Sequence, residues 1–347
     1  MSEGSSGPGA SALIDGYDAA LFDLDGVVYL GPEAVPGAVE GVAELRRRGA
    51  RLGFVTNNAA RTPGEVSAHL RELGIDADAA DVVTSSQAAA GLLAERFDSG
   101  AKVLVVGGAA LFTALEEVGL VGVSSVDDGP VAVIQGFSFD LAWAQLNEAA
   151  IAIQRGAHWV ATNTDSTRPT ERGIVPGNGA AVGAVRLAVS VEPEVAGKPF
   201  PPLVRETMQR LDAQRPIFVG DRIDTDIAGA AAAGIDSLWV MTGAHGPADL
   251  LAAGRGQRPT HIGLDLGELL APPRVVRRQV NRAVCRRMSA YTTGRLVVLE
   301  AGPRDARERV DALWVVARLV WEAQDRGRPL DAAGAVDRLQ TLSSGDD

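Results

Sequence analysis

The stretch ALFDLDGVVYLG, residues 20–31, decides the fold of this chain. Two carboxylates, Asp23 and Asp25, interrupt a run that is otherwise apolar, and a short apolar run of this kind predicts a buried strand. Carboxylates at the end of a buried strand are desolvated and repel each other unless something pairs with them. The rest of the chain has to supply that partner.

Seven further apolar runs predict strands, and they alternate with segments that have helical patterning. Helices are predicted over residues 36–49, 62–74 and 140–156, and each ends in a glycine, the usual left-handed stop. This alternation predicts an α/β fold with parallel sheets, whose ligands bind at the carboxyl ends of the strands. Asp23, Thr56 and Asp221 lie at such ends. The predicted strands are residues 19–24, 51–57, 81–85, 102–108, 131–136, 159–163, 215–221 and 237–243.

Composition places the chain among globular proteins. It has 347 residues, of which 46% are apolar and 22% charged, and its net charge of −11 argues against nucleic acid or an anionic membrane as a partner. The single cysteine, Cys285, excludes an internal disulfide, and the histidines show no metal-ligand spacing. The opening MSEGSSGPGASA has no signal-peptide pattern, and no apolar run reaches membrane-spanning length. We therefore expect a cytoplasmic protein.

The character of the chain changes at residue 272. The residues that follow hold 14 arginines and no lysine, including six arginines in residues 274–287. A hairpin is predicted near Gly294, and Trp314 and Trp321 belong to the apolar stripe of a predicted helix. We expect a small α+β extension with solvated arginines and internally packed tryptophans. The alternative is an interaction platform that recruits a partner through this basic segment.

Four short motifs occur in order along the chain. They are DLDG (23–26), VTNN (55–58), AGKP (196–199) and GDRIDTD (220–226). Each alone has an ordinary reading as a loop, a helix cap or a turn. Together they favour one site, because each ends a predicted strand or leads into one.

The lysine in the third motif is unusual for this chain, which has 31 arginines but only two lysines, Lys102 and Lys198. A compact ammonium contacts a carboxylate and a phosphate oxygen together, which the bulkier guanidinium does less well. A carboxylate nucleophile, a fixed cation and a divalent metal are what phosphoryl transfer through an aspartyl phosphate requires. Carboxylate and carbonyl oxygens are the ligands that Mg²⁺ prefers. The two aspartates would thus be paired with a metal.

With these motifs, and with phrases such as FVTNNAAR, PTERGIVPGNGA and GDRIDTDI, the chain resembles the NagD-like branch (subclass IIA) of the haloacid dehalogenase (HAD) superfamily. The resemblance implies a Rossmann-like parallel-sheet core, residues 15–80 and 194–271, with an inserted α/β cap of the C2 type at residues 81–193. A flexible tail at residues 1–14 and the extension at residues 272–347 complete the predicted organisation. The extension is similar to that of actinobacterial glycerol-3-phosphate phosphatases.

The resemblance also implies roles for individual residues. Asp23 would be the nucleophile and a Mg²⁺ ligand, and Asp25 the general acid and base, with its carbonyl on the metal. Asp221 would complete the metal site and Asp226 would order it from behind. The phosphoryl group would be held by Thr56, the Asn57 backbone and Lys198.

The expected substrate is a small phosphorylated metabolite, because the cap of this branch closes over the site. Glycerol 3-phosphate is the first candidate, and phosphoglycolate, pyridoxal phosphate, a sugar phosphate or transfer to an acceptor alcohol stay open. Specificity is expected from Asn58 and from the cap loop 163–173, where Arg168 and Arg172 would contact the leaving group. PGNGA, residues 176–180, is interpreted as a turn in which Asn178 and Gly179 adopt unusual backbone angles. Relatives with this cap often dimerise through it, so a homodimer is expected.

Overall fold

The structure is a computed structural model that describes residues 11–170 and 172–340. Its contacts divide the chain into two compact units: the described residues up to Arg51 together with those from Arg215 onward form unit 1, and Leu52–Gln214 form unit 2. A 3₁₀ helix, Leu13–Gly16, buries Leu13 and Ile14, and the Leu13 amide donates to the Ala271 carbonyl at 2.8 Å. The predicted flexible tail therefore extends too far: Leu13 and Ile14 are apolar and pack against the protein. Residues 1–10 of that tail lie outside the described residues.

Unit 1 contains four parallel strands in the order β15-β14-β13-β1. Strands β1 and β13 are buried along their whole length, and their register pairs Phe22 with Val219, so both end at the same level of the sheet. The strands are β1 (Ala19–Asp23), β13 (Pro216–Gly220), β14 (Asp236–Val240) and β15 (His261–Gly263). The other elements before the extension include the short pair β2 (Tyr29–Leu30) and β3 (Glu33–Ala34) and the helices α1 (Ala38–Arg47), α8 (Ala228–Ala233) and α9 (Pro247–Ala252).

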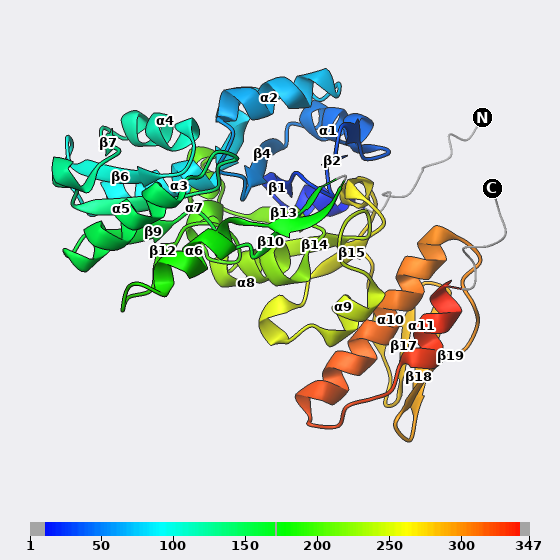
Figure 1. The fold of residues 1–347 in the computed structure, drawn as a ribbon. Coiled ribbons are helices and arrows are strands. Elements are labelled where there is room, and N and C mark those ends of the chain that lie inside the picture. The colour runs from blue at the N-terminus through cyan, green and yellow to red at the C-terminus, as the bar shows by residue number, and fades with distance from the viewer. Residues whose placement is uncertain (1–10, 171, 341–347) are drawn as a thin grey trace, which may run out of the picture. The chain divides into compact units, whose positions relative to one another are not determined.

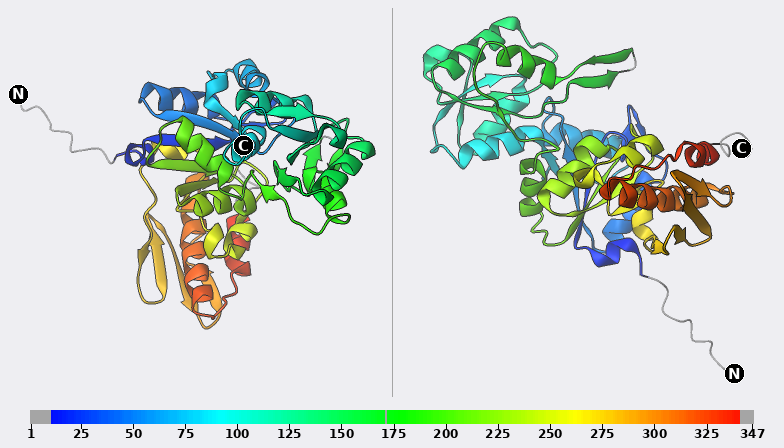
Figure 2. Two further views of the ribbon diagram at one scale, coloured as in Figure 1. Left: turned by 90° about the vertical axis from the view of Figure 1, so that its left-hand side faces the viewer. Right: turned by 90° about the horizontal axis from the view of Figure 1, so that it is seen from below.

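Unit 2 contains a parallel pair of strands, β4 (Arg51–Thr56) and β5 (Val82–Thr84), and a parallel sheet in the order β12-β9-β8-β6-β7. The sheet strands are β6 (Lys102–Val106), β7 (Val121–Val123), β8 (Ala132–Gln135), β9 (His158–Ala161) and β12 (Glu194–Val195). The helices are α2 (Pro63–Glu72), α3 (Ser85–Ala94), α4 (Ala109–Glu117), α5 (Trp143–Gln154), α6 (Asn178–Arg186) and α7 (Pro202–Arg210). The antiparallel hairpin β10 (Thr167–Thr170) and β11 (Gly173–Pro176) extends away from this sheet (Figure 2).

The α/β prediction is confirmed, and each of the eight predicted strands is present as a parallel strand. Buried hydrophobic runs identified these strands because both faces of a parallel sheet are covered. The two-residue strands β2, β3 and β12 are too short to show a pattern, and the sequence did not predict them. The boundaries predicted for core, cap and extension stay predictions.

The extension belongs to unit 1 and consists of four antiparallel strands with a long helix lying along them (Figure 1). Gly294 turns the predicted hairpin, and Trp314 and Trp321 pack edge to face within the unit, as expected. The elements are β16 (Arg277–Arg278), β17 (Arg282–Cys285), β18 (Met288–Thr293), β19 (Leu296–Leu299), α10 (Ala306–Asp325) and α11 (Ala333–Gln340). In the part of the chain that the structure describes, neither α10 nor another helix is long and apolar enough to cross a membrane.

A single apolar cluster joins the extension to the rest of unit 1. It contains Trp239 and Ile262 from the parallel strands, Leu250 from α9, and Leu313 and Trp321 from α10, all of them buried. The Trp321 indole also donates to the Leu250 carbonyl at 3.0 Å. The extension therefore completes a hydrophobic core that begins in the parallel sheet.

The expectation of solvated arginines is wrong for Arg274. Its side chain is 3% exposed, donates to Asp311 at 2.8 Å and forms an ion pair with Glu268. Burial raises the pKa of Asp311 and of Glu268, and burial together with the Asp311 charge raises the pKa of Cys285 to about 12. Four other arginines of residues 274–287 also form ion pairs within this unit: Arg278, Arg282, Arg286 and Arg287. These ion pairs with carboxylates compensate much of the positive charge of the basic segment.

Candidate active site

Three carboxylates of unit 1 meet where β1 and β13 end. Asp23 is the last residue of β1, Asp221 follows β13, and Asp226 lies in the π-helical turn Ile223–Ile227. One carboxylate oxygen from each lies within 4.8 Å of the others, and all three residues are buried. The parallel register of the two strands produces this meeting, because Asp23 follows Phe22, Gly220 follows its paired residue Val219, and Asp221 comes next.

Asp221 is held through its backbone and its carboxylate by the segment 239–244. The Trp239 indole donates to the Asp221 carbonyl at 2.7 Å, and the Ala244 amide donates to Oδ2 of the carboxylate at 2.6 Å. Two glycines make room for that carboxylate: a Cβ on Gly26 would lie 2.7 Å from Oδ2, and one on Gly243 would overlap it. The carboxylate is therefore fixed by contacts that are independent of any ligand.

Asp25 lies on a tight loop directly after β1 and is exposed, unlike Asp23. Three successive amides, from Val27 to Tyr29, donate to the Leu24 carbonyl, and Gly26 closes the loop with a φ of +91°. Thr242 donates to the Gly26 carbonyl at 2.5 Å. The end of β1 and the loop after it thus carry one buried and one exposed carboxylate.

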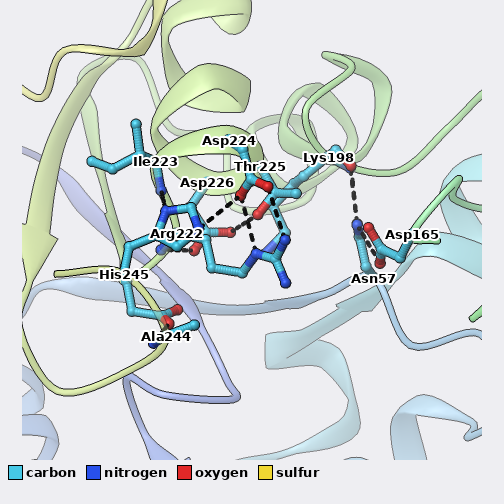
Figure 3. Close-up of polar contacts among 11 residues, drawn as sticks. Asn57, Asp165, Lys198, Arg222, Ile223, Asp224, Thr225, Asp226, Ala244 and His245 are labelled. Atoms are coloured by element: carbon cyan, nitrogen blue, oxygen red, sulfur yellow. Dashed lines mark hydrogen bonds and ion pairs between the residues drawn. The ribbon is translucent and has the colours of Figure 1, made fainter. Parts of the chain in front are cut away.

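The turn that carries Asp226 is fixed by its own hydrogen bonds (Figure 3). The Arg222 amide donates to Asp226 Oδ2 at 3.0 Å, and the Ile223 amide donates to Nδ1 of His245 at 2.9 Å. Burial raises the pKa of the neighbouring Asp224 carboxyl, but the hydrogen bonds and charge of Arg222 outweigh burial and hold that pKa below its ordinary value. A charged Asp224 keeps Arg222 in place at the start of the turn.

The cluster fits a divalent cation. Three buried carboxylates so close together repel each other strongly unless a positive charge lies between them. Hard oxygen donors of this kind are the ligands that Mg²⁺ takes in proteins. The ion would lie among Asp23, Asp221 and Asp226. The Asp25 carbonyl that we expected on the metal and the supporting role of Asp226 stay predictions.

Replacing Gly243 by alanine tests this arrangement. The new Cβ would overlap the Asp221 carboxylate, so we expect Mg²⁺ affinity, measured by isothermal titration calorimetry, to fall by about 10- to 100-fold. Gly246→Ala is the matched control, because no atom lies within 4 Å of a Cβ built there. Equal Mg²⁺ affinities for the two variants would contradict the proposed position of the ion.

The predicted phosphate-binding residues belong to unit 2. Thr56 ends β4, is buried, and accepts a hydrogen bond from the Asn58 amide at 3.0 Å. Lys198 follows β12 and is 3% exposed. The structure brings Asn57 and Lys198 together, since the Asn57 carboxamide bonds both the amide and the carbonyl of Lys198. Asn58 is exposed and its side chain accepts from the Ala60 amide.

The two arginines of the loop 163–173 differ in their surroundings. The Arg168 guanidinium lies over the rings of Phe137 and Phe139, at 4.7 and 5.0 Å from their centroids. These rings pack edge to face, 5.2 Å apart. Arg172, near the tip of the same hairpin, is exposed. Arg168 is therefore the better ordered of the two.

The interpretation of PGNGA as a turn with unusual backbone angles at Asn178 and Gly179 is wrong. Asn178 starts α6, and neither residue has a positive φ. The Asn178 side chain donates to the Asn163 carbonyl at 2.8 Å, and a Cβ on Gly179 would overlap the Thr164 carbonyl. The motif provides close approach to the loop after β9.

Sequence reasoning missed two polar residues of that loop. Asn163 donates to the Asn57 carbonyl at 2.8 Å, and Asp165 accepts from the Asn57 side chain at 3.2 Å. One signal was available: the predicted strands 51–57 and 159–163 both end in Thr-Asn, as Thr56-Asn57 and Thr162-Asn163. Contacts across 106 and 108 residues have no other mark in the sequence.

Comparison with known proteins identifies relatives. A family model of haloacid dehalogenase-like hydrolases matches residues 20–121, and a HAD hydrolase-like model matches residues 195–269. D-glycerol 3-phosphate phosphatase of Mycobacterium tuberculosis is 50% identical over 253 residues, 73% of this chain and 71% of the relative. Acid sugar phosphatase of Staphylococcus aureus is 36% identical over 257 residues, 74% of this chain and 97% of the relative. The crystal structure of a glycerol phosphate phosphatase from Mycobacterium tuberculosis with magnesium has a TM-score of 0.85 and 42% identity over 96% of this chain and 99% of that one.

Proposed function

The chain belongs to the haloacid dehalogenase-like hydrolases and is a Mg²⁺-dependent phosphatase of small phosphomonoesters, and on that premise we propose that its substrate is glycerol 3-phosphate. The observation that carries the reaction class is the buried cluster of Asp23, Asp221 and Asp226 at the ends of two paired strands. Support for the substrate comes from the 50% identical relative, and from a solved glycerol phosphate phosphatase whose likeness extends over 96% of this chain.

The proposed reaction has two steps. A carboxylate oxygen of Asp23 attacks phosphorus while the bond from phosphorus to the leaving-group oxygen breaks. The exposed Asp25 carboxyl donates its proton to the leaving-group oxygen. Asp25 then takes a proton from a water molecule, whose oxygen attacks phosphorus and releases phosphate from Asp23. Burial of Asp23 supports its part, because a carboxylate with little hydration is a better nucleophile.

Charge balance assigns the remaining residues. Mg²⁺, when bound, offsets the repulsion between the Asp23 carboxylate and the phosphate dianion. Asp23, Asp221 and the Asp25 carbonyl would hold that ion, with Asp226 ordering the site from behind. Lys198, Thr56 and the Asn57 backbone amide would contact the phosphoryl oxygens. The burial of Lys198 supports this role, because an ammonium group with few water contacts interacts more strongly with an anion.

A panel of phosphomonoesters tests the substrate. We expect kcat/KM to be highest for glycerol 3-phosphate, compared with phosphoglycolate, pyridoxal phosphate and a sugar phosphate, and phosphate release to stop on chelation of Mg²⁺. Added glycerol or ethanol separates hydrolysis from transfer, since transfer would give a phosphorylated alcohol. A higher kcat/KM for one of the other esters would replace glycerol 3-phosphate, and undiminished release under chelation would overturn the mechanism.

Arg168 is proposed to contact the leaving group, with Arg172 and Asn58 as further specificity residues. The ring contacts of Arg168 support its place, because two aromatic faces fix the guanidinium plane and leave its edge for hydrogen bonds. We expect Arg168→Ala to raise KM for glycerol 3-phosphate about tenfold with a smaller change in kcat, since a hydrogen bond to a charged group contributes about 1.5–3 kcal/mol. Arg155→Ala, which replaces an exposed arginine directly after α5, is the control. An unchanged KM would remove Arg168 from the specificity residues.

Three finer points complete the proposal. We propose a cytoplasmic enzyme, residues 81–193 as its cap, and a homodimer formed through that cap. Exposed apolar side chains of unit 2, among them Trp143 and Leu187, support an interface there.

A further inference from the structure

The backbone of Lys198 is held at two points by one side chain. The Asn57 carboxamide donates through Nδ2 to the Lys198 carbonyl at 3.0 Å and accepts at Oδ1 from the Lys198 amide at 2.8 Å (Figure 3). The two residues are 141 positions apart in the chain. The orientation of the carboxamide is determined, because a flipped group would face donor with donor and acceptor with acceptor.

The second proton of the same amide group goes to the cap loop. Nδ2 of Asn57 also donates to Oδ2 of Asp165, at 3.2 Å. A carboxamide has two N–H donors, so its contacts with Asp165 and the Lys198 carbonyl use both. Because the acceptor at Asp165 is a carboxylate, this hydrogen bond is of the stronger, charge-assisted kind.

The surroundings leave this junction little freedom to move. The Asn57 carbonyl accepts from Ser85 at 2.7 Å and from Asn163 at 2.8 Å, and Asn163 also accepts from the Asp165 amide. A Cβ on Gly197 would lie 2.5 Å from the Thr162 carbonyl and 2.7 Å from Oδ1 of Asn57. The loop after β9 and the segment that carries Lys198 therefore meet Asn57 at van der Waals contact.

From this geometry we infer that Asp165 and the side chain of Asn57 are positioning residues, which hold the Lys198 backbone so that its ammonium group meets the phosphoryl group. The inference rests on the proposed function for the role of Lys198. A lysine side chain has four rotatable bonds, and its attachment point is what neighbours can fix. Through Asn57, the hydrogen bond to Asp165 also links the Lys198 backbone to the loop that leads into β10, the strand that carries Arg168.

The two lysines of the chain allow a test that does not depend on activity. Lys198 is 3% exposed, whereas Lys102 is exposed and serves as an internal reference. The full-length protein is treated with an amine-acylating reagent, and the modification of each lysine is followed by mass spectrometry. In Asp165→Ala and Asn57→Ala we expect Lys198 to react at least about fivefold faster relative to Lys102, because each hydrogen bond lost makes local opening around Lys198 more frequent.

The same variants are compared in phosphate release. We expect kcat to fall by about 10- to 100-fold in Asp165→Ala, since misplacement of a catalytic group by 1 Å has effects of that size. Asp165→Asn keeps an acceptor oxygen and is expected to recover much of both losses. Combined with Lys198→Ala, the Asp165→Ala change is expected to add less than about a twofold loss, because the two act as one unit. Asp140→Asn, an exposed carboxylate of the same unit, is the control.

The outcomes separate the inference from the proposed function. Unchanged Lys198 reactivity in folded Asp165→Ala and Asn57→Ala overturns the inference, as does a full additional loss in the double variant. If Lys198 reactivity rises but Lys198→Ala releases phosphate at the normal rate, Asp165 and Asn57 hold Lys198 and its proposed role in the reaction is wrong. Should Asp165→Ala not fold, as judged by circular dichroism, Asp165→Ser and the near-isosteric Asn57→Asp take its place, and the same results decide.

Discussion

We expect Asp23→Asn to lower kcat for phosphate release by about 10⁴-fold or more, because a neutral amide cannot attack phosphorus and no other group would replace the proposed nucleophile. The same change has the opposite effect on stability. Three buried carboxylates lie within 4.8 Å of one another, and removing one negative charge relieves their repulsion. In the presence of a chelator, the variant is therefore expected to unfold at a higher temperature than the parent protein.

The measurements are phosphate release with Mg²⁺ and thermal unfolding without it. Asp140→Asn provides the control, because it removes one charge from an exposed position. A variant that is inactive and also less stable than the parent would indicate a general loss of structure. A variant that turns over at a near-normal rate would show that Asp23 is not the nucleophile.

Deletion of residues 272–347 is expected to cost the protein its stable fold. The deletion exposes Trp239, Leu250 and Ile262, which are buried in the cluster shared with α10. A fully buried large apolar side chain contributes about 1.5–3 kcal/mol, and domains are stable by only about 5–15 kcal/mol. Glu268 also loses Arg274, its ion-pair partner. We expect insoluble protein, or a thermal transition lowered by many degrees.

This deletion also decides between the two hypotheses for the extension. A shortened protein that is soluble, has normal kcat/KM and loses only a binding partner would favour the interaction platform. A milder variant guards against a total loss of protein: Trp321→Ala removes an indole that is buried and bonded to Leu250. It is expected to lower stability by about 3–5 kcal/mol, measured by urea unfolding. Arg328→Ala, an exposed position of the extension, is its control.

The sequence predicted the parts of this protein that repeat a simple pattern. The eight strands appeared as apolar runs, and the aspartates stood out because they interrupt one of them. Parallel pairing then implied that the strands before Asp23 and Asp221 end at one level, and the register pairs Phe22 with Val219 near both ends. The four motifs were informative for the same reason, since each is attached to a strand end.

The contacts that the sequence did not predict join residues that are far apart along the chain. Arg274 looked like one of six solvated arginines, and only the fold brings Asp311 and Glu268 to it. Asp165 lies in a loop whose two arginines were predicted specificity residues, and its own contact with Asn57 spans 108 residues. Asn178 and Gly179 suggested a turn by their residue types, whereas their role is to let two segments approach. Local residue preferences carry no information on such contacts.

The hydrophobic core that the extension shares with the parallel sheet makes its acquisition hard to reverse in evolution. When a newly added segment first covers a surface, the residues beneath it are free to become apolar, because water no longer reaches them. Once residues such as Leu250 and Ile262 are apolar, loss of the segment would expose them to water, which a protein that never had the segment would not experience. Each further apolar replacement under the extension would make its loss more destabilising, so descendants would keep the segment even if it contributed nothing to turnover.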